Sequence, residues 1–191
     1  AIVDAALESY LEQGLEFDKT AVAASVCAFI KGRMAQMARD EKVSADTVAA
    51  VSDGDVTVPV HFFELAHALE KARANDREAF TNLATAYARA AHLADEELGT
   101  EVDRNLMGDA ELALLDATDA AHDEVASALD ARDFKAVIAA LAALRGPIDA
   151  FFDNVMVMDE DLAVRENRLC LLNRFESVFA GIANIGEMAR K

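Results

Sequence analysis

The sequence predicts an all-α protein, a bundle of about seven or eight helices, and three observations support this fold class. First, only 8 glycines and 2 prolines occur in 191 residues, so few positions break a helix. Second, apolar residues recur at intervals of three and four along most of the chain. Third, 53% of the residues are hydrophobic, which is enough to fill a sizeable core and excludes a disordered chain.

We expect a single helical domain over residues 1–191, in which residues 1–54 form the N-terminal helices and residues 55–191 form the main bundle. The boundary is the stretch SDGDVTVP, residues 52–59. It combines an aspartate–glycine turn with a proline that suits the first turn of a new helix. This is the clearest break in the helical pattern.

Three helices are predicted before that break. The first is short and ends near Gly14. Asp18 or Thr20 can cap the second helix. Ser44 can cap a brief third helix, which runs through Val51. The apolar stripe predicted for the second helix consists of Val22, Val26, Phe29, Ile30, Met34 and Met37.

Further helical segments follow the break. Asn75 or Asp76 can start one of them, and an acidic helix comes later in the chain. Gly146 and Pro147 then interrupt the pattern, and because a proline removes one hydrogen bond and clashes with the preceding turn, a kink or a restart is forced. The residues expected in the core after this interruption are Ile148, Phe151, Phe152 and Val155. The final helix is predicted to carry, in helical register, Leu169, Leu172, Phe175, Phe179 and Ile182.

The formal charge is strongly negative and unevenly spread. The chain carries 18 Lys and Arg against 35 Asp and Glu, a net charge of −17. This charge argues against nonspecific binding to nucleic acid, because two polyanions repel each other. Residues 95–133 alone hold 13 acids and 2 bases. Residues 31–42 and 161–191 carry a small basic excess, so a negatively charged partner still has places to bind.

No catalytic or metal-binding motif is evident in the sequence. A glycine-rich phosphate loop, H-E-x-x-H and G-x-S-x-G are all missing, and the four histidines are scattered. Cys27 and Cys170 have no C-x-x-C spacing, and we expect both thiols to be reduced and structural, as in a cytoplasm. No apolar stretch reaches the roughly 20 residues of a membrane span, and the first residues do not resemble a signal peptide. We therefore expect a soluble, cytoplasmic protein without a membrane partner.

One long stretch resembles a known family. Residues 140–175, ALAALRGPIDAFFDNVMVMDEDLAVRENRLCLLNRF, resemble the C-terminal end of the beta subunit of the bacterial two-subunit glycyl-tRNA synthetase. In that family a leucine-rich helix leads through Arg-x-Pro into V-D-A-F-F-D-x-V-M-V-M, an acidic turn and an R-x-N-R-L helix. A match of this length is specific.

Two upstream stretches agree with the same family in order and spacing. FIKGRMAQMARDEKVSADTVAAV places Arg33 and Asp46 at matching positions, and NLATAYARAAHLA places Arg89 on the family's arginine. There are two departures: Val43 lies near the usual glycine, and His92 stands where the family has asparagine. The resemblance covers nearly the whole chain.

The resemblance implies the helical anticodon-binding domain known by its D-A-L-R pattern, which recognises the anticodon of tRNA(Gly) during glycyl-tRNA aminoacylation. The implied partners are tRNA(Gly), the alpha subunit and the rest of the beta subunit, with no role for DNA. In this family the ATP, Mg²⁺ and glycine sites of the glycine–tRNA ligase lie on the alpha subunit. We therefore expect this chain, which begins without methionine, to be a fragment of a longer subunit with no cofactor and no catalytic residue of its own.

Eight residues are candidates for contact with RNA. Glycine codons begin with two guanines, so every glycine tRNA shows two cytosines in its anticodon. The cytosine edge offers an amino donor to Asp or Glu and two acceptors to Arg or Asn. Unpaired bases also stack on aromatic or guanidinium planes, which contributes about 1–3 kcal/mol per base. The candidates are Tyr87, Arg89, His92, Asp153, Asn154, Arg165, Asn167 and Arg168.

Two alternatives stay open on the sequence alone. Arg165 and Arg168 are three residues apart and share a helix face, but either could instead pair with a carboxylate and hold the kinked region in place. The carboxylates considered for such a pair are Asp149, Asp153 and Asp159. The chain could also be an acidic helical adaptor that mediates protein contacts within the synthetase, because residues 95–133 suit a basic protein better than RNA.

Overall fold

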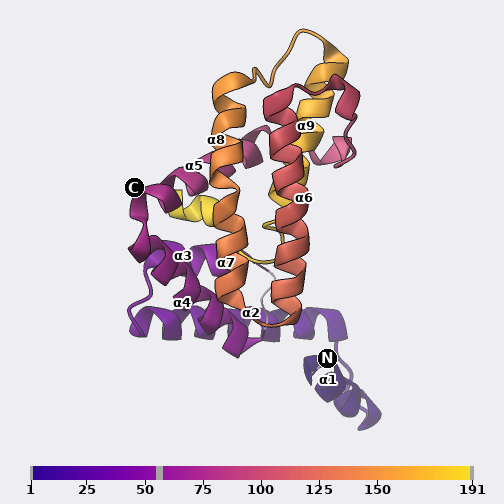
Figure 1. The fold of residues 1–191 in the computed structure, drawn as a ribbon. Helices are drawn as coiled ribbons and strands as arrows, with labels where there is room; N and C mark the ends of the chain where they lie inside the picture. Colours follow the sequence, from indigo (N-terminus) through magenta and orange to yellow (C-terminus); the bar gives the residue numbers. More distant parts are fainter. Residues whose placement is uncertain (1, 55–57, 190–191) are drawn as a thin grey trace.

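The computed structural model describes residues 2–54 and 58–189, and in these residues it contains nine α-helices, three short 3-10 helices and no strand (Figure 1). The all-α class is confirmed. The α-helices are α1 Ile2–Glu12, α2 Lys19–Asp40, α3 Ala45–Asp53, α4 Pro59–Asn75, α5 Arg77–Leu93, α6 Asp109–Asp130, α7 Phe134–Ala143, α8 Arg145–Asn154 and α9 Leu162–Ser177. The 3-10 helices are η1 Glu96–Leu98, η2 Arg104–Leu106 and η3 Ile185–Ala189.

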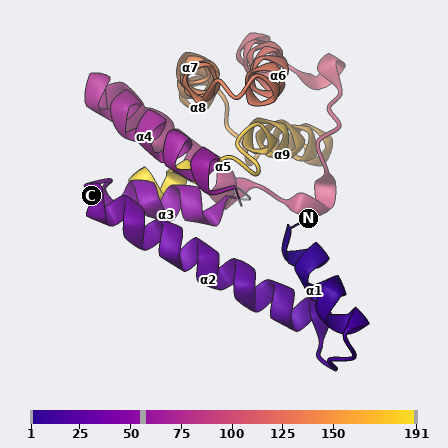
Figure 2. The ribbon, with the colours of Figure 1, turned by 90° about the horizontal axis from the view of Figure 1, so that it is seen from below.

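The helices form an upright bundle on a base of N-terminal helices. α6 stands beside the α7–α8 pair, and α9 lies behind α6 (Figure 1). α5 and α6 each pack against both α8 and α9, which ties these four helices together. α2 lies across the base next to α3, while α1 extends away from the end of α2 (Figure 2). None of the helices in the described part of the chain is long and apolar enough to cross a membrane.

The predicted break at residues 52–59 falls between α3 and α4. Its central residues, 55–57, lie outside the described residues. Pro59 is the first residue of α4, as predicted. α4 packs against both α2 and α3, so the two sides of the break are in contact. The division of the chain at residue 54 stays a prediction.

Helix starts follow the predicted capping residues in two of three places. The Asp18 carboxylate accepts a hydrogen bond from the Ala21 amide (3.0 Å) at the start of α2, and the Asp76 carboxylate accepts one from the Ala79 amide (2.9 Å) at the start of α5. Ser44 precedes α3, but its side chain makes no capping bond to the α3 backbone. Its hydroxyl is instead engaged by other side chains, described below.

The predicted restart of the helix is confirmed, but the interruption falls at Leu144, and Gly146 and Pro147 lie inside α8. α7 ends at Ala143 and α8 begins at Arg145, so the two helices stack as one interrupted column (Figure 1). Pro147 is the third residue of α8, within the first turn, where a missing backbone amide removes no helical hydrogen bond. Counted as one kinked helix, α7 and α8 bring the total to eight, within the predicted number.

The final helix is shorter than predicted. α9 ends at Ser177, and Phe179 and Ile182 lie beyond it, although both are buried as expected. The chain turns at Gly181, whose φ of 74° is left-handed, and then folds back. This reversal lets η3 pack against α3 and α5, and the Asn184 amide donates to the Ala50 carbonyl (2.9 Å). Tertiary packing therefore ends the helix where the apolar spacing would continue it.

The apolar stripe predicted on α2 is only partly covered. Met34 is buried, together with Ala35 and Ala38, where α2 packs on the rest of the chain. Phe29, however, is 68% exposed and Met37 is 47% exposed. α2 therefore leaves part of its predicted apolar stripe open to solvent.

A charged cluster joins the start of α3 to the end of α4. The Arg73 guanidinium donates to Asp46 Oδ2 (2.5 Å) and to Ser44 Oγ (2.6 Å), and it also pairs with Glu70 Oε2 (3.1 Å). The Ser44 hydroxyl donates to the Glu70 carboxylate. Desolvation raises the pKa of both carboxyl groups, but the hydrogen bonds from Ser44 and the Arg73 charge outweigh it. The pKa of Asp46 therefore lies below its ordinary 3.8 and that of Glu70 below its ordinary 4.5.

We expect Arg73→Met to weaken the protein at neutral pH and to flatten its loss of stability in acid. The lowered pKa values of Asp46 and Glu70 stabilise the folded state above pH 4.5, and this contribution is lost as the pH falls through the lowered values. Without Arg73 the two carboxylates face each other with no cation between them. The free energy of unfolding at pH 7 should fall by about 1–2 kcal/mol, because the cluster is partly exposed.

Urea unfolding of both proteins at a series of pH values between about 3 and 7 measures this effect. Arg39→Met, which removes an exposed cation from α2, is the matched control and should leave the pH dependence unchanged. If the two variants give the same curve, the cluster does not contribute to stability.

Candidate nucleic-acid interface

The predicted RNA-binding residues lie on α5, α8 and α9. α5 packs against both α8 and α9. Tyr87, Arg89 and His92 belong to the second half of α5, and Asp153 and Asn154 are the last two residues of α8. The other three candidates lie in the first two turns of α9. The structure divides these eight residues into an exposed group and a group used inside the fold.

Arg89 stands over an aromatic platform. It is exposed, and its guanidinium carbon lies 4.0 Å from the centroid of the Phe152 ring, a cation–π contact. Phe152 is half-buried and packs edge-on against Phe151 (5.4 Å between ring centroids), which is fully buried. The core therefore fixes the ring, and the ring supports the guanidinium at the surface.

Three further candidates are exposed, and each follows Arg89 or Phe152 by at most three residues in the sequence. His92 lies in the last turn of α5, three residues after Arg89 and so on the same side of the helix. Asp153 and Asn154 directly follow Phe152, and the Asn154 amide donates to the Ala150 carbonyl (2.8 Å) within α8. Asp153 thus leaves a carboxylate at the surface that can accept hydrogen bonds.

Arg165 is half-buried in the first turn of α9. In the part of the chain that the structure describes, its side chain forms no ion pair with Asp149, Asp153 or Asp159. Asp149 pairs instead with Arg145 in its own helix (3.6 Å). The guanidinium of Arg165 is therefore available for an external anion.

Tyr87 belongs to the core instead of the surface. Its side chain is 8% exposed, and its ring centroid lies 4.8 Å from that of Phe179. Desolvation is the main cause that raises the pKa of Tyr87 to about 12, with Glu176 and Asp53 adding to it. In this arrangement the ring packs against the protein, and a base cannot stack on it.

Asn167 holds a connecting segment in place. Its side-chain oxygen accepts from the Asp103 amide (2.7 Å), and its side-chain nitrogen donates to the Asp103 carbonyl (3.0 Å). Asn173, two turns further along α9, makes the same pair of bonds to Asp95 (3.0 and 2.7 Å) and also donates to the Gly99 carbonyl (2.7 Å). Both amides therefore fix the connection between α5 and α6.

Arg168 is occupied by internal partners. Its Nε donates to Glu111 Oε1 (2.8 Å), and its Nη1 donates to Asp159 Oδ2 (2.7 Å) and to the Met156 carbonyl (2.9 Å). Desolvation acts against the charge, but the bonds to the two carboxylates outweigh it and raise the pKa of Arg168. The backbone amide of Asp161 and then Arg168 lower the pKa of Asp159. The ion-pair alternative applies to Arg168, with Glu111 as a second and unexpected partner.

The acidic helix α6 uses part of its charge to hold other elements. Besides Glu111, Asp119 pairs with Arg174 of α9 (2.6 Å) and Asp116 pairs with Arg104 of η2 (2.9 Å). The Glu111 carboxylate also accepts from the Gly108 amide (2.7 Å) at the start of α6. These internal pairs account for several carboxylates of residues 95–133 without a basic protein partner.

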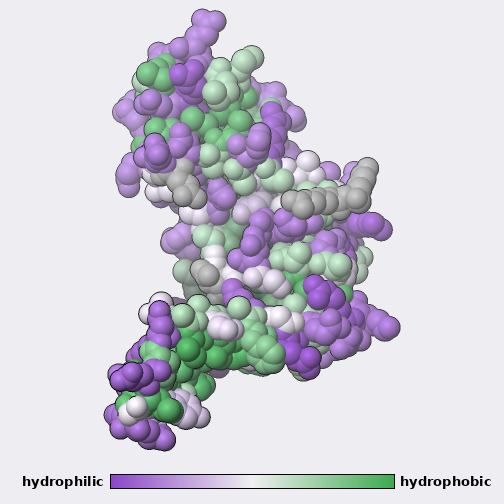
Figure 3. All heavy atoms as spheres, turned by 180° about the vertical axis from the view of Figure 1, so that it is seen from behind, coloured by the Kyte–Doolittle hydropathy of each residue, from purple (hydrophilic) through white to green (hydrophobic). Residues whose placement is uncertain are grey.

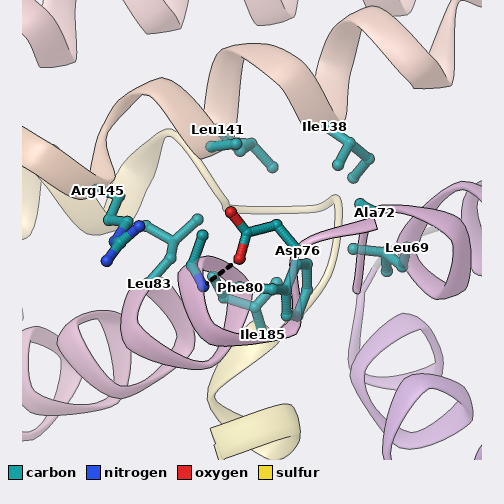
Figure 4. A pocket seen from close by; sticks show the side chains of 11 residues that line it. Leu69, Ala72, Asp76, Phe80, Leu83, Ile138, Leu141, Arg145 and Ile185 are labelled. Carbon is teal, nitrogen blue, oxygen red and sulfur yellow. Dashed lines mark hydrogen bonds between the residues drawn. The ribbon is translucent and has the colours of Figure 1, made fainter. Parts of the chain in front are cut away.

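The hollows described for this protein lie away from Arg89 and Arg165. The largest, about 930 Å³, runs between α4 and α7 and is mainly apolar. A small one of about 90 Å³ lies where α4, α5, α7 and η3 meet, with Leu69, Phe80 and Ile138 around it (Figure 4). The Asp76 carboxylate at its edge is occupied by the α5 cap. Neither hollow is lined by any of the eight predicted RNA-binding residues.

The two cysteines lie in different surroundings. Cys170 is buried, and its thiol donates to the Leu98 carbonyl (3.4 Å), which fits the structural role expected. Cys27 is exposed on α2, so a structural role for this thiol is not seen. Among residues 2–54 and 58–189, no three His, Cys, Asp or Glu side chains are placed to hold a metal ion.

Phe152 is the residue that sequence reasoning missed at this site. It lies in the apolar stripe of α8 beside Phe151 and was therefore expected in the core. It does pack on the core, but it also supports Arg89 from a neighbouring helix. The spacing within one helix carries no signal for such a contact, because the contact depends on how α5 and α8 pack.

Three known proteins that are similar to this chain carry the same name. The chain is 36% identical over 187 residues to the glycine–tRNA ligase beta subunit of Acinetobacter baumannii (strain AYE), covering 96% of this chain and 27% of that protein. It is 37% identical over 183 residues to the protein of the same name from Geotalea daltonii, covering 93% and 26%. It is 38% identical over 165 residues to that from Vibrio cholerae, covering 84% and 24%.

This chain spans about a quarter of the length of these relatives. A model of the family described as the DALR anticodon binding domain matches residues 83–185, more than half of the chain. The matched range contains Arg89 and Phe152, the two asparagines of α9 that hold the connection between α5 and α6, and the ion pairs of Arg168. The chain therefore belongs to the DALR anticodon binding domain family.

Proposed function

We propose that the chain is the anticodon-binding part of a glycine–tRNA ligase beta subunit and recognises the anticodon of tRNA(Gly) during glycyl-tRNA aminoacylation. The observation that carries this proposal is the exposed guanidinium of Arg89 over the Phe152 ring, inside the range matched by the DALR anticodon binding domain. The relatives that carry the ligase name are similar along more than four fifths of this chain, which supports the choice of tRNA.

Each exposed candidate has a distinct chemical role in this proposal. Arg89 offers an unpaired base a planar cation on which to stack. Asp153 accepts from the amino group of a cytosine, and Arg165 binds a phosphate. His92 and Asn154 flank these contacts. Because few cations of this chain face the RNA, few counterions are released on binding, so the affinity should fall only modestly with salt.

The remaining parts of the enzyme take the catalytic role. In this proposal ATP and Mg²⁺ bind on the alpha subunit, and the enzyme works in the cytoplasm, where tRNA is charged. The alpha subunit and the rest of the beta subunit are then the protein partners of this chain. Among the described residues we assign none to the chemistry of ligation.

Binding of labelled tRNA(Gly) to the chain, measured by filter binding, tests the proposal. Arg89→Ala removes the stacking cation, and Phe152→Leu removes its support but keeps an apolar side chain. We expect each to raise the Kd by about 5- to 150-fold, which corresponds to 1–3 kcal/mol for one stacked base. A tRNA(Gly) with an altered anticodon should bind the wild-type chain more weakly by a similar factor.

Two further variants separate the site from general electrostatics. Arg77→Ala removes an exposed cation from the other end of α5 and should change the Kd little. Arg89→Lys keeps the charge but loses the planar guanidinium on which a base stacks. Its Kd for tRNA(Gly) should therefore be closer to that of Arg89→Ala than to that of the wild type. The proposal fails if the wild-type chain shows no preference for tRNA(Gly) over the altered tRNA at any ionic strength.

A further inference from the structure

The α8–α9 loop, which we define as residues 155–161, holds two methionine side chains out from the fold. Met156 is 75% exposed and Met158 is 57% exposed, whereas Val157 between them is buried. Leu162, the first residue of α9, adds a third exposed apolar side chain. The loop lies at the end of the bundle opposite α2 (Figure 1). Hydrophobic and hydrophilic atoms lie side by side at this end of the molecule (Figure 3).

Hydrogen bonds fix the backbone of this loop. Arg168 Nη1 donates to the Met156 carbonyl (2.9 Å) and to Asp159 Oδ2 (2.7 Å). The Asp159 amide donates to the Val157 carbonyl (3.0 Å), and the Asp159 carboxylate accepts from the Asp161 amide (3.0 Å). The two methionine side chains therefore project from a backbone that is already ordered. A ligand that binds them does not have to order the loop first, which lowers the entropy cost of binding.

Most of the negative charge of the loop is engaged inside the protein. Asp159 pairs with Arg168, and the Asp161 carboxylate accepts from the Ala163 amide (2.9 Å) at the start of α9. Glu160 is the one acid of the loop whose side chain has no bond in the described part of the chain. The acids that surround the methionines thus repel an anionic ligand less than their number indicates.

The methionines are bordered by hydrogen-bonding groups. Asp153 and Asn154 directly precede the loop, and both are exposed. Arg165 follows Leu162 by three residues, so the two share a side of α9. An apolar surface is therefore flanked in the chain by a carboxylate and an amide on one side and by a guanidinium on the other.

The exposed apolar surface is too small for a protein partner. Side chains of the size of the two methionines and Leu162 together expose on the order of 300 Å². A stable protein–protein contact buries about 800 Å² on each partner, and this requirement applies equally to the rest of a longer subunit. An unpaired nucleobase is a smaller ligand, with an apolar face and hydrogen-bonding edges. The arrangement of apolar and polar groups at the loop matches a base.

We propose that Met156 and Met158 pack against the faces of unpaired bases in the anticodon loop of tRNA(Gly). This inference rests on the proposed function and extends its contact surface from α5 and α8 to the α8–α9 loop. A methionine side chain is flexible and polarisable, so it can follow the face of a base, and proteins also use methionine as an apolar wedge between bases. Arg168 is then a positioning residue, because it holds the loop and does not touch the RNA.

Protection from oxidation tests the contact directly. Hydrogen peroxide converts exposed methionine to the sulfoxide, and mass spectrometry gives the rate for each residue. At a tRNA(Gly) concentration of about ten times the Kd, about nine tenths of the chain is bound, so oxidation of Met156 and Met158 should slow about 5- to 10-fold. Met37 is the internal control, since it is 47% exposed on α2 and should oxidise at the same rate with and without tRNA.

Substitution measures what the contact contributes to affinity. The double variant Met156→Ala with Met158→Ala should raise the Kd for tRNA(Gly) by about 5- to 30-fold in filter binding. The double variant Met156→Leu with Met158→Leu keeps two apolar side chains of similar size, so its Kd should stay close to that of the wild type. Met37→Ala is the matched control and should leave the Kd unchanged. Circular dichroism confirms that all three variants fold.

Two results would overturn this inference and leave the proposed function intact. The first is an unchanged oxidation rate of Met156 and Met158 when tRNA(Gly) is bound. The second is a double alanine variant that binds tRNA(Gly) as tightly as Met37→Ala does. In either case Arg89→Ala can still weaken binding, because that contact is measured separately. A wild-type chain without any preference for tRNA(Gly) over the tRNA with an altered anticodon would remove both proposals.

Discussion

Arg168→Ala should lower the free energy of unfolding by about 3–5 kcal/mol, which is the cost of removing one partner from a buried ion pair. The side chain of Arg168 is 15% exposed and that of its partner Glu111 is 5% exposed. Without the guanidinium, a buried carboxylate loses its counterion. The Met156 carbonyl also loses a donor, so the segment between α8 and α9 loses its attachment to α9.

Urea unfolding followed by circular dichroism measures the loss, and Arg165→Ala is the matched control. Arg165 is an arginine of the same helix, one turn earlier, and its replacement should cost less than about 1 kcal/mol. The double variant Arg168→Met with Glu111→Leu should recover most of the stability, because an apolar pair of similar size avoids the unpaired charge. Equal stability of Arg168→Ala and Arg165→Ala would show that the ion pair contributes nothing.

Asn173→Ala should cost about 2–4 kcal/mol. This amide makes three hydrogen bonds to backbone groups of the segment between α5 and α6, at distances of 3.0, 2.7 and 2.7 Å. The side chain is 9% exposed, so water does not easily replace these bonds. Each bond contributes on the order of 1 kcal/mol, and each backbone group left unpaired adds its own cost.

Hydrogen exchange gives a local measurement of the same effect. The Asp95 amide, which donates to Asn173, should exchange faster in the variant, and η1 beside it should open more often. Asn154→Ala is the control, since this exposed amide bonds only to Ala150 within its own helix in the described structure. If the Asp95 amide is equally protected from exchange in Asn173→Ala, the hydrogen bonds of Asn173 are not what holds the segment between α5 and α6.

The helices could be predicted from the sequence because they depend on local chemistry. Apolar spacing located each helix, and Asp18, Asp76 and Pro147 marked starts through groups that act within one turn. The end of α9 was predicted wrongly, because Phe179 continues the apolar spacing although the chain has already turned. The apolar spacing predicts which residues are buried, and Phe179 and Ile182 are indeed buried. They reach the core through the turn that follows α9, and not as part of a longer helix.

The candidate site could be predicted only in part. Arg89 was identified by resemblance, and its exposed position agrees with a role in binding. Asn167 and Arg168 looked equally suitable in the sequence, yet their partners Asp103 and Glu111 lie 64 and 57 residues away. A side chain that binds RNA and one that clamps a distant segment have the same local pattern, so only the packing of α9 separates them.

The contact between α3 and η3 affects how this protein folds during synthesis. Asn184 bonds to Asp53 across 131 residues, and Ala50 and Val51 beneath this contact are fully buried. Closing so long a loop costs entropy and slows folding. At about 5–20 residues per second, a ribosome needs on the order of ten seconds to make the segment between them. For that time the part of α3 that packs against η3 stays uncovered in a nascent chain.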